Sequence, residues 1–333
     1  MPPETEDPLI LVTGSTGKVG QHFLGRLLAD PAYERFRARA LCHNRILETN
    51  ERLGVVCGSI SERSVVHDAL EGVTHVLHLA TCKETPADIM DVTVKGMFWL
   101  LEEARQSDTF RQLILIGGDA GMGHFFYPHP FPVTEMQSHS AYPGCYALSK
   151  VLEEVMLEQY HVQYELNGCC LRAPWIMEKD DFRYTLSFRD DVFGGPRWCD
   201  LVGPESAAEL AAKGTVPVLC DRDGEAIDRN FVHVSDLVEA VLLAIDHPNT
   251  PGETFNVCMD EPVNYRRVAE HLESTRGLPS VDIETEYFST WMDNAKAKFL
   301  LRWKPEYDLE RLVDAAWDYQ RGIDDPRKVW YPG

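Results

Sequence analysis

A glycine-rich loop near the start of the chain constrains its fold more than any other stretch. The apolar residues 9–12 lead into a loop that carries Gly14, Gly17 and Gly20, and an apolar pattern of helical period follows. Gly14 can take the backbone angles of a tight turn, Gly17 lets the chain approach a ligand, and Gly20 lets a helix lie against the strand. This order of strand, turn and helix predicts a pyrophosphate site at the helix N-terminus. An ordinary turn between a strand and a helix is the alternative.

The residues expected to hold a dinucleotide follow two strands. The first group is Gly14, Ser15, Thr16, Gly17, Lys18, Val19 and Gly20. The second group is His43, Asn44 and Arg45, at the end of an expected strand at 36–42. An acidic residue there would bind the ribose 2′-hydroxyl of NAD, and none is present. Arg45, or His43 when charged, can face a 2′-phosphate, so the sequence leans toward NADP. A solvated loop arginine is the alternative.

Strands and helices alternate through about residue 175. Alternation of this kind predicts an α/β fold with a doubly wound parallel sheet and right-handed crossovers. The expected strands lie at 9–12, 36–42, 54–60, 74–81, 111–118 and 166–175, and long helices are expected at 93–105 and 142–158. Beyond residue 175 the pattern breaks into short pieces, including a strand at 216–219 and helices at 237–245, 265–276 and 309–320. We expect these returns of the chain to build a lid.

The acidic composition narrows the class of partner. A net charge of −21, spread along the chain, repels nucleic acid and anionic membranes, although a local pocket can still bind an anion. Neither an apolar run of about 18 residues nor a signal peptide is evident. Nine scattered cysteines predict reduced thiols and a cytoplasmic setting. His124, His129 and His139 have no ligand-pair spacing, so we expect no metal.

Tyr146 and Lys150 form the clearest chemical pair. They lie four positions apart on an expected helix, so their side chains share one face. An ammonium beside a phenol favours the phenolate and lowers the tyrosine pKa, which suits a general acid or base near neutral pH. A surface pair is the alternative. Together with the glycine loop, the pair predicts a site where a nicotinamide exchanges a hydride with a substrate hydroxyl.

Six segments carry a family resemblance. They are Thr13-Gly14-x-x-Gly17-x-x-Gly20, His78-Leu79-Ala80, Tyr146-x-x-x-Lys150, Leu171-Arg172-Ala173-Pro174, residues 229–236 and Trp303-Lys304-Pro305-x-Tyr307. Together they resemble the extended short-chain dehydrogenase/reductases of the NAD-dependent epimerase/dehydratase family. The resemblance implies a Rossmann domain at 8–175 with returning segments near 216–258, and a smaller substrate-binding part at 176–215 and 259–330. It also implies a homodimer through helices near 93–106 and 146–160.

The resemblance assigns further site residues. Lys150 would hydrogen-bond the nicotinamide ribose. Additional cofactor contacts would be Ser59, Ile60, Leu79, Ala80, Thr81, Pro174, Trp175 and Ile176. Lys83 matches a lysine near the active site of UDP-galactose 4-epimerase-like members, and Arg229 matches an arginine that often contacts a substrate phosphate. The loop at 121–128, with His124 and Phe125, is expected to line the substrate.

Several positions depart from the family pattern. A serine or threonine that usually binds the reacting oxygen is replaced by Gly118, a change that removes one orienting hydrogen bond. Asp119, Ser140, Ser149 or water are candidates to replace it. Further departures are Ser59 for an aspartate, Thr93 for an asparagine, and Ala173-Pro174-Trp175 where nucleotide-sugar epimerases tend to carry an asparagine. These changes weaken a nucleotide-sugar substrate more than they weaken the cofactor.

Three functional hypotheses follow. The first is an NAD(P)-dependent oxidoreductase or epimerase that acts on a sugar or sugar derivative, with Tyr146 as acid and base, Lys150 as activator and Asp119 as a substrate contact. The second is a sugar or sugar-acid dehydrogenase, because the loop at 121–128 is similar to that of uronate dehydrogenases. The third is a catalytically weak NADP-binding regulator, which only Gly118 favours.

Overall fold

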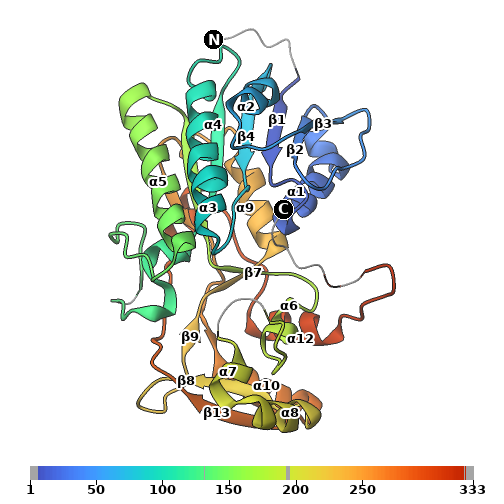
Figure 1. Cartoon of the computed structure of the whole chain (residues 1–333), viewed down its shortest axis with the longest axis vertical. Coiled ribbons are helices and arrows are strands. Elements are labelled where there is room, and N and C mark those ends of the chain that lie inside the picture. Colours follow the sequence, from blue (N-terminus) through green and yellow to red (C-terminus); the bar gives the residue numbers. More distant parts are fainter. Residues whose placement is uncertain (1–6, 131, 193–195, 326, 328–333) are drawn as a thin grey trace.

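A parallel sheet organises the larger part of the protein in the computed structural model, which describes residues 7–130, 132–192, 196–325 and 327 (Figure 1). Its seven strands lie in the order β11 (Thr254–Asn256), β6 (Gly168–Ala173), β5 (Gln112–Gly118), β4 (His75–His78), β1 (Leu9–Thr13), β2 (Arg37–Cys42) and β3 (Leu53–Cys57). All neighbouring pairs are parallel. The chain builds outward from β1 to β3 and then returns to the other side of β1 at β4. The expected doubly wound fold is therefore confirmed, and its switch point, where such folds bind ligands, lies between β1 and β4.

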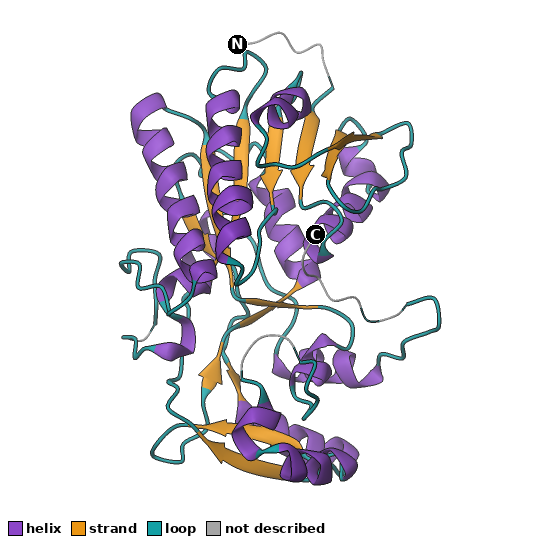
Figure 2. Cartoon of the chain, viewed as in Figure 1, coloured by secondary structure: helices purple, strands orange, loops and turns teal. Residues whose placement is uncertain are grey.

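Helices cover both faces of this sheet, as Figure 2 shows. They are α1 (Lys18–Ala29), α2 (Arg63–Leu70), α3 (Pro86–Ile89), α4 (Gly96–Ala104), α5 (Cys145–Tyr164), α9 (Val234–Ala244) and α11 (Ala295–Leu300). Short turns of helix are η1 (Pro31–Tyr33), η2 (Met90–Lys95), η3 (Asp119–Met122) and η4 (His124–Phe126).

The strand sequences explain why both faces are covered. Ile114 and Ile116 of β5 pack in the apolar cluster that includes residues of α1 and α9, whereas Leu113 and Leu115 pack in the cluster with α2, α4 and α5. Successive side chains of a strand point to opposite faces, so a strand that is apolar throughout needs a helical layer on each side. The continuous apolar runs seen in the sequence are therefore the cause of the three-layer arrangement.

A second, smaller part lies below the sheet in Figure 1. It contains the parallel pair β8 (Val216–Cys220) and β13 (Ser280–Glu284), with α6 (Asp181–Thr185), α7 (Trp198–Val202), α8 (Pro204–Ala212), α10 (Tyr265–Arg276) and α12 (Leu309–Asp318). Two short pairs connect the parts: β7 (Trp175–Met177) with β10 (Phe231–His233), and β9 (Asp228–Arg229) with β12 (Val263–Asn264). This part has an apolar cluster of its own, with Trp198 fully buried in it.

The path of the chain between the two parts differs from the expectation at two places. Residues 216–220 were expected to return to the Rossmann domain, but β8 pairs with β13 and packs in the second cluster. Conversely, Trp303 packs in the sheet cluster, and its indole N–H donates to the Asp236 carbonyl of α9 at 2.9 Å. Both pairings join distant segments, so local sequence pattern does not reveal them.

Two helices also differ from their expected bounds. Helix α5 starts at Cys145 rather than at residue 142, because Pro143 precedes Gly144, whose φ of 156° is not helical. The expected helix at 93–105 divides into the π-helical η2 and the α-helical α4. None of the helices in the described ranges is both long enough and apolar enough to cross a membrane.

Candidate active site

The glycine loop has the tight geometry that a dinucleotide cradle requires. Gly14 has a φ of +62°, and a Cβ placed there would lie 2.9 Å from the Ala80 nitrogen. A Cβ on Gly20 would lie 2.6 Å from the Gly14 carbonyl oxygen, which would push the helix off the loop. Gly17 precedes α1 and supplies no side chain to cap it, so the first-turn N–H groups can bind an anion. These residues therefore fit the pyrophosphate of a dinucleotide.

Two segments that were expected to line the cofactor groove lie against this loop. The backbone N–H groups of Leu79 and Ala80 both donate to Thr13 Oγ1 at 3.1 Å, which fixes them beside the glycine turn. From the other side, the Ile176 carbonyl accepts a hydrogen bond from Lys18 Nζ at 2.9 Å. The structure thus brings the ends of β1 and β4 and the start of β7 together at the switch point.

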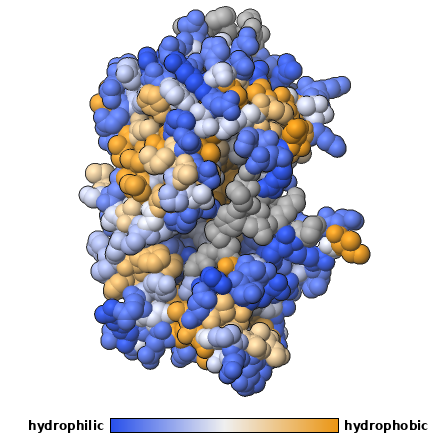
Figure 3. Space-filling view, in the orientation of Figure 1, coloured by the Kyte–Doolittle hydropathy of each residue, from blue (hydrophilic) through white to orange (hydrophobic). Residues whose placement is uncertain are grey.

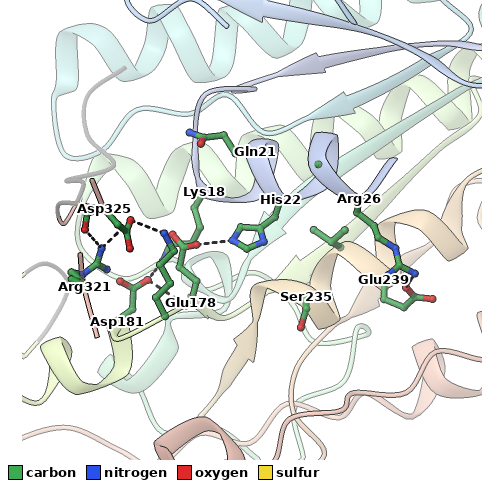
Figure 4. Close-up of a pocket in the computed structure, with 13 residues that line it drawn as sticks. Lys18, Gln21, His22, Arg26, Glu178, Asp181, Ser235, Glu239, Arg321 and Asp325 are labelled. Atoms are coloured by element: carbon green, nitrogen blue, oxygen red, sulfur yellow. Dashed lines mark hydrogen bonds and ion pairs between the residues drawn. The ribbon is translucent and has the colours of Figure 1, made fainter. Parts of the chain in front are cut away.

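Lys18 itself turns toward the second part of the molecule. Its Nζ lies 2.5 Å from Asp181 Oδ2, so its charge is already balanced by an acid. Figure 4 shows Lys18 in a pocket of about 520 Å³ between α1, α9 and the segment after β7, where His22 also pairs with Glu178 at 2.6 Å. The lining of this pocket does not include Tyr146 or Lys150. It is a charged recess beside the glycine loop, distinct from the acid–base pair.

The residues expected at the adenosine end are open to solvent. His43, Asn44 and Arg45 are all exposed beyond β2, whereas Ser15 holds the end of that strand by donating to the Leu41 carbonyl at 3.1 Å. The other two predicted contacts, Ser59 and Ile60, follow β3. Ile60 is buried. It packs against Gly96, where a Cβ would lie 2.9 Å from the Ile60 side chain, so the close packing favours glycine at position 96.

Tyr146 lies between two lysines. The Lys83 Nζ is 4.0 Å from the centre of the Tyr146 ring, and the Lys150 Nζ is 5.9 Å from it. Lys150 is buried, and its Nζ donates to Glu153 Oε2 at 2.8 Å. Burial alone would raise the pKa of Tyr146, but the charges of Lys83 and Lys150 outweigh burial and hold the pKa below its ordinary value. The arrangement can therefore supply a phenolate at a lower pH than a free tyrosine.

A carboxylate that the sequence analysis missed holds this tyrosine in place. Glu84 Oε2 accepts hydrogen bonds from the backbone N–H groups of Cys145 and Tyr146, at 2.9 and 3.3 Å. These are the first N–H groups of α5, where a negative charge also complements the helix dipole. A side chain at Gly144, whose φ is +156°, would have to displace this carboxylate, because a Cβ there would lie 2.7 Å from Glu84 Oε1.

At Gly118, where the family usually carries a serine or threonine, there is room for a side chain. Gly118 ends β5 with an extended φ of −159°, and a Cβ there would meet its nearest neighbour, the Ala173 carbonyl oxygen, at an ordinary 3.7 Å. Gly117 differs, since a Cβ there would lie 2.6 Å from Cys170 Sγ. The absence of a serine at 118 is therefore a feature of the sequence and not a requirement of packing.

Asp119 is held by a buried chain of polar groups. Its Oδ2 lies 2.8 Å from His124 Nδ1, and His124 Nε2 lies 2.6 Å from Arg229 Nη2. Because an arginine can only donate, Nε2 must accept, so the proton of the neutral imidazole is on Nδ1, the nitrogen that lies near Asp119. Burial lowers the pKa of His124, which keeps the ring neutral. Nothing in sequence spacing links these three residues, which come from η3, η4 and β9.

Aromatic rings surround this chain. The Arg229 guanidinium lies 4.5 Å from the ring of Phe125 and 4.4 Å from that of Trp175, and its side chain is buried. Phe125 in turn meets Tyr287 edge to face at 4.4 Å. The loop at 121–128 is thus packed beside Asp119. The other two histidines have separate partners, since His129 contacts the His124 carbonyl and His139 pairs with Glu154.

The first half of the chain matches a known protein family. Residues 10–177 match the model of the NAD dependent epimerase/dehydratase family, which is half of the chain. The chain belongs to the NAD-dependent epimerase/dehydratase family. The match agrees with the resemblance noted in the sequence and identifies the chain as an enzyme of the epimerase/dehydratase type.

Relatives of this family cover nearly the whole chain. The UDP-glucose 4-epimerase of Rhizobium meliloti (strain 1021) is 27% identical over 336 residues, which span 93% of this chain and 96% of that protein. A short-chain dehydrogenase/reductase superfamily protein from Agrobacterium tumefaciens, solved with bound NAD, has a TM-score of 0.76 at 24% identity, covering 92% and 95%. The UDP-glucuronic acid 4-epimerase from Bacillus cereus, in complex with UDP-glucuronic acid and NAD, has a TM-score of 0.71 at 19% identity, covering 93% and 98%.

Proposed function

We propose that this protein oxidises a hydroxyl of a sugar or sugar derivative by hydride transfer, with Tyr146 as the general base and, in the reverse step, the general acid. The observation that carries the proposal is the position of Tyr146 between Lys83 and Lys150, on a Rossmann sheet whose glycine loop fits a dinucleotide. A bound nicotinamide would supply the hydride acceptor. Tyr146 Oη would take the proton from the substrate hydroxyl, and the two ammonium groups would stabilise the phenolate before that transfer.

Asp119 and Lys83 are our candidates for the substrate side. Asp119 follows the position of the missing hydroxyl, and one of its carboxylate oxygens lies 2.8 Å from His124, which in turn contacts Arg229. A fixed acceptor of this kind would bind a neighbouring substrate hydroxyl and orient the carbon that loses the hydride. Arg229 is buried against His124 in this arrangement, so we propose that it supports the substrate loop as well as serving as a candidate substrate contact.

Lys150 and the strand ends would hold the cofactor. In the proposal, Lys150 reaches the nicotinamide ribose, while Leu79, Ala80, Thr81, Pro174, Trp175 and Ile176 line the groove. The exposed His43, Asn44 and Arg45 replace the usual acid beyond β2, which favours NADP over NAD at the adenosine end. Comparing the affinities for the two cofactors in the natural protein and in Arg45→Ala tests this part. An unchanged preference in Arg45→Ala would contradict it.

An apolar surface on α4 and α5 supports a homodimer. Phe98, Leu148, Val155 and Val162 are exposed on these helices, and apolar groups gather over this upper left region in Figure 3. Isolated apolar residues are ordinary on a surface, but several on two adjacent helices favour association. Light scattering of the natural protein and of Val162→Glu tests the dimer. Equal masses corresponding to one chain in both would overturn it.

The enzyme is tested with the protein as it is purified. Denaturation should release an NAD(P) nucleotide if the cofactor stays bound, and the absorbance of the reduced nicotinamide should rise with a substrate from a panel of sugars, sugar acids and nucleotide sugars. A keto product that leaves indicates a dehydrogenase, as the similarity to uronate dehydrogenases favours. A keto intermediate that stays bound and takes the hydride back on its opposite face gives the epimer of the substrate and indicates an epimerase. Tight cofactor binding with no redox change for any substrate would count against the proposal.

A further inference from the structure

Glu153 is a fully buried carboxylate that the family motif does not include. It lies on α5 one turn beyond Lys150, it is 0% exposed, and its Oε2 accepts from Lys150 Nζ at 2.8 Å. A charged carboxylate persists in a protein interior only when a cation or several donors pair with it. Lys150 supplies that cation, and in return Glu153 keeps a buried lysine protonated that would otherwise lose its charge on burial.

The second oxygen of Glu153 lies near a buried histidine that also contacts the strand before the glycine loop. Glu153 Oε1 lies 3.3 Å from His78 Nε2, and His78 Nδ1 lies 2.8 Å from Thr13 Oγ1. Since Thr13 Oγ1 already accepts from the N–H groups of Leu79 and Ala80, its own proton is free to go to Nδ1. This leaves Nε2 as the ring nitrogen near Glu153, at 3.3 Å and without hydrogen-bond geometry. The buried chain from Lys150 therefore ends beside the glycine loop.

These contacts change the balance of charge around Tyr146. Lys83 and Lys150 place two positive charges near its ring, and Glu153, 2.8 Å from the Lys150 ammonium, adds one negative charge. The other titratable groups that face this site are His78 on β4, Glu84 after it, Tyr142 before α5, Asp119 on η3 and Cys170 on β6. Among these charged groups, Glu153 is the carboxylate that contacts the lysine of the Tyr146 pair.

We propose that Glu153 is a positioning residue of the acid–base site: it holds the Lys150 ammonium in place and balances one of the two lysine charges that Tyr146 faces. The consequence is a tyrosine that ionises more readily than a free phenol, but less readily than two unbalanced lysines would make it. This inference rests on the proposed role of Tyr146. The neighbouring Glu154 pairs instead with Arg172 of β6 at 2.7 Å, an ion pair that ties helix to strand.

The titration of Tyr146 in Glu153→Gln tests the proposal without any substrate. The ultraviolet absorbance of the phenolate is followed against pH in the natural protein and in the variant, and the curve of the matching Tyr146→Phe protein is subtracted from each. We expect the midpoint of Tyr146 to move down by about one pH unit in Glu153→Gln, since one nearby negative charge is lost. Glu158→Gln, the same change at an exposed position of α5, should leave the midpoint in place.

The outcomes separate this inference from the proposed function. A natural protein in which Tyr146 does not ionise below the ordinary tyrosine range contradicts the proposed function. A midpoint that is lowered in the natural protein but is unmoved or raised in Glu153→Gln overturns only the role of Glu153.

A second measurement applies if Glu153→Gln does not fold. In the Tyr146→Phe protein, where Glu153 is the remaining anion beside Lys150, carbon NMR of the lysine side chains is assigned with an added Lys150→Arg change. We expect Lys150 to keep its proton to a pH above the ordinary lysine value of about 10.4. Loss of the proton below that value would show that Glu153 does not hold the charge.

Discussion

The Lys83 ammonium lies over the face of the Tyr146 ring, 4.0 Å from its centre, and so joins the loop after β4 to the start of α5. The Lys150 ammonium lies 5.9 Å from the centre of the same ring. Lys83, which does not belong to the Tyr-x-x-x-Lys motif, is therefore the closer of the two lysines. An ammonium over an aromatic face is attracted to it, and a charge this close favours the phenolate. The tyrosine therefore depends on a residue of the loop after β4 as well as on its own helix.

Lys83→Met should move the ionisation of Tyr146 to higher pH. Burial raises the pKa of Tyr146 and the two lysines lower it, so the loss of one lysine returns the pKa toward its ordinary value of about 10 or beyond. Activity in the oxidising direction needs the phenolate. The rise of this activity with pH should therefore also shift to higher pH. Phenolate absorbance and the pH profile of kcat/KM both report the shift. Lys213→Met, at the exposed position just after α8, serves as control, and equal pH profiles in the two variants would contradict the assignment.

Gly118→Ser should restore the missing hydrogen bond to the reacting oxygen. The site has room for a Cβ, whose nearest neighbour would be at 3.7 Å, and the backbone is extended, so no strain opposes the change. Since one orienting donor of this kind is worth about a hundredfold or more in other enzymes, we expect kcat to rise by about tenfold or more. Gly118→Ala adds the same Cβ without the hydroxyl. A serine variant no faster than the alanine variant would show that Asp119 or another group already fills the role.

Removal of the Glu84 carboxylate should loosen the start of α5. Glu84→Ala leaves the N–H groups of Cys145 and Tyr146 without their acceptor, and loss of such a cap costs about 1 kcal/mol in the free energy of unfolding. Denaturant unfolding measures the loss, and kcat should fall because Tyr146 is then less well placed. Glu84→Gln keeps an acceptor and should recover part of both. Identical stability of the natural and alanine proteins would show that water replaces this cap at no cost.

Gly20→Ala should abolish cofactor binding while the chain still folds. The added Cβ would lie 2.6 Å from the Gly14 carbonyl and 2.7 Å from Ser15 Cα, so the loop must move away from α1. Gly25→Ala is a matched control on the same helix, because no atom lies within 4 Å of a Cβ there. That change should raise stability by about 0.5–1 kcal/mol, as alanine favours a helix interior, and leave the affinity unchanged. Calorimetric titration with NAD and NADP distinguishes the two variants. Equal affinities would contradict the loop as the cradle.

The sequence predicted the features that depend on local order. The glycine spacing and the apolar runs were enough to predict the parallel sheet, because a strand that is apolar on both faces needs helices on both sides of the sheet. The pair Tyr146 and Lys150 was visible because both residues lie on one helix. The assignment of residues 216–220 to the second part was not predictable, since β8 takes its register from β13 much later in the chain.

The site residues that were not predicted leave weaker signals in the sequence. Glu153 stands three positions after Lys150 on an amphipathic helix, so a charged residue at an expected core position was the available clue. The chain from Asp119 through His124 to Arg229 joins three separate elements, and only folding brings them together.

The most direct test of the account is the rate of cofactor reduction in Tyr146→Phe, measured with the first substrate that the natural protein turns over. The variant keeps the ring and the helix but has no proton to exchange. We predict a fall in kcat of about 10² to 10⁴, with cofactor affinity unchanged and the rise of rate with pH abolished. A Tyr146→Phe protein that retains the natural rate and pH profile would contradict the central claim.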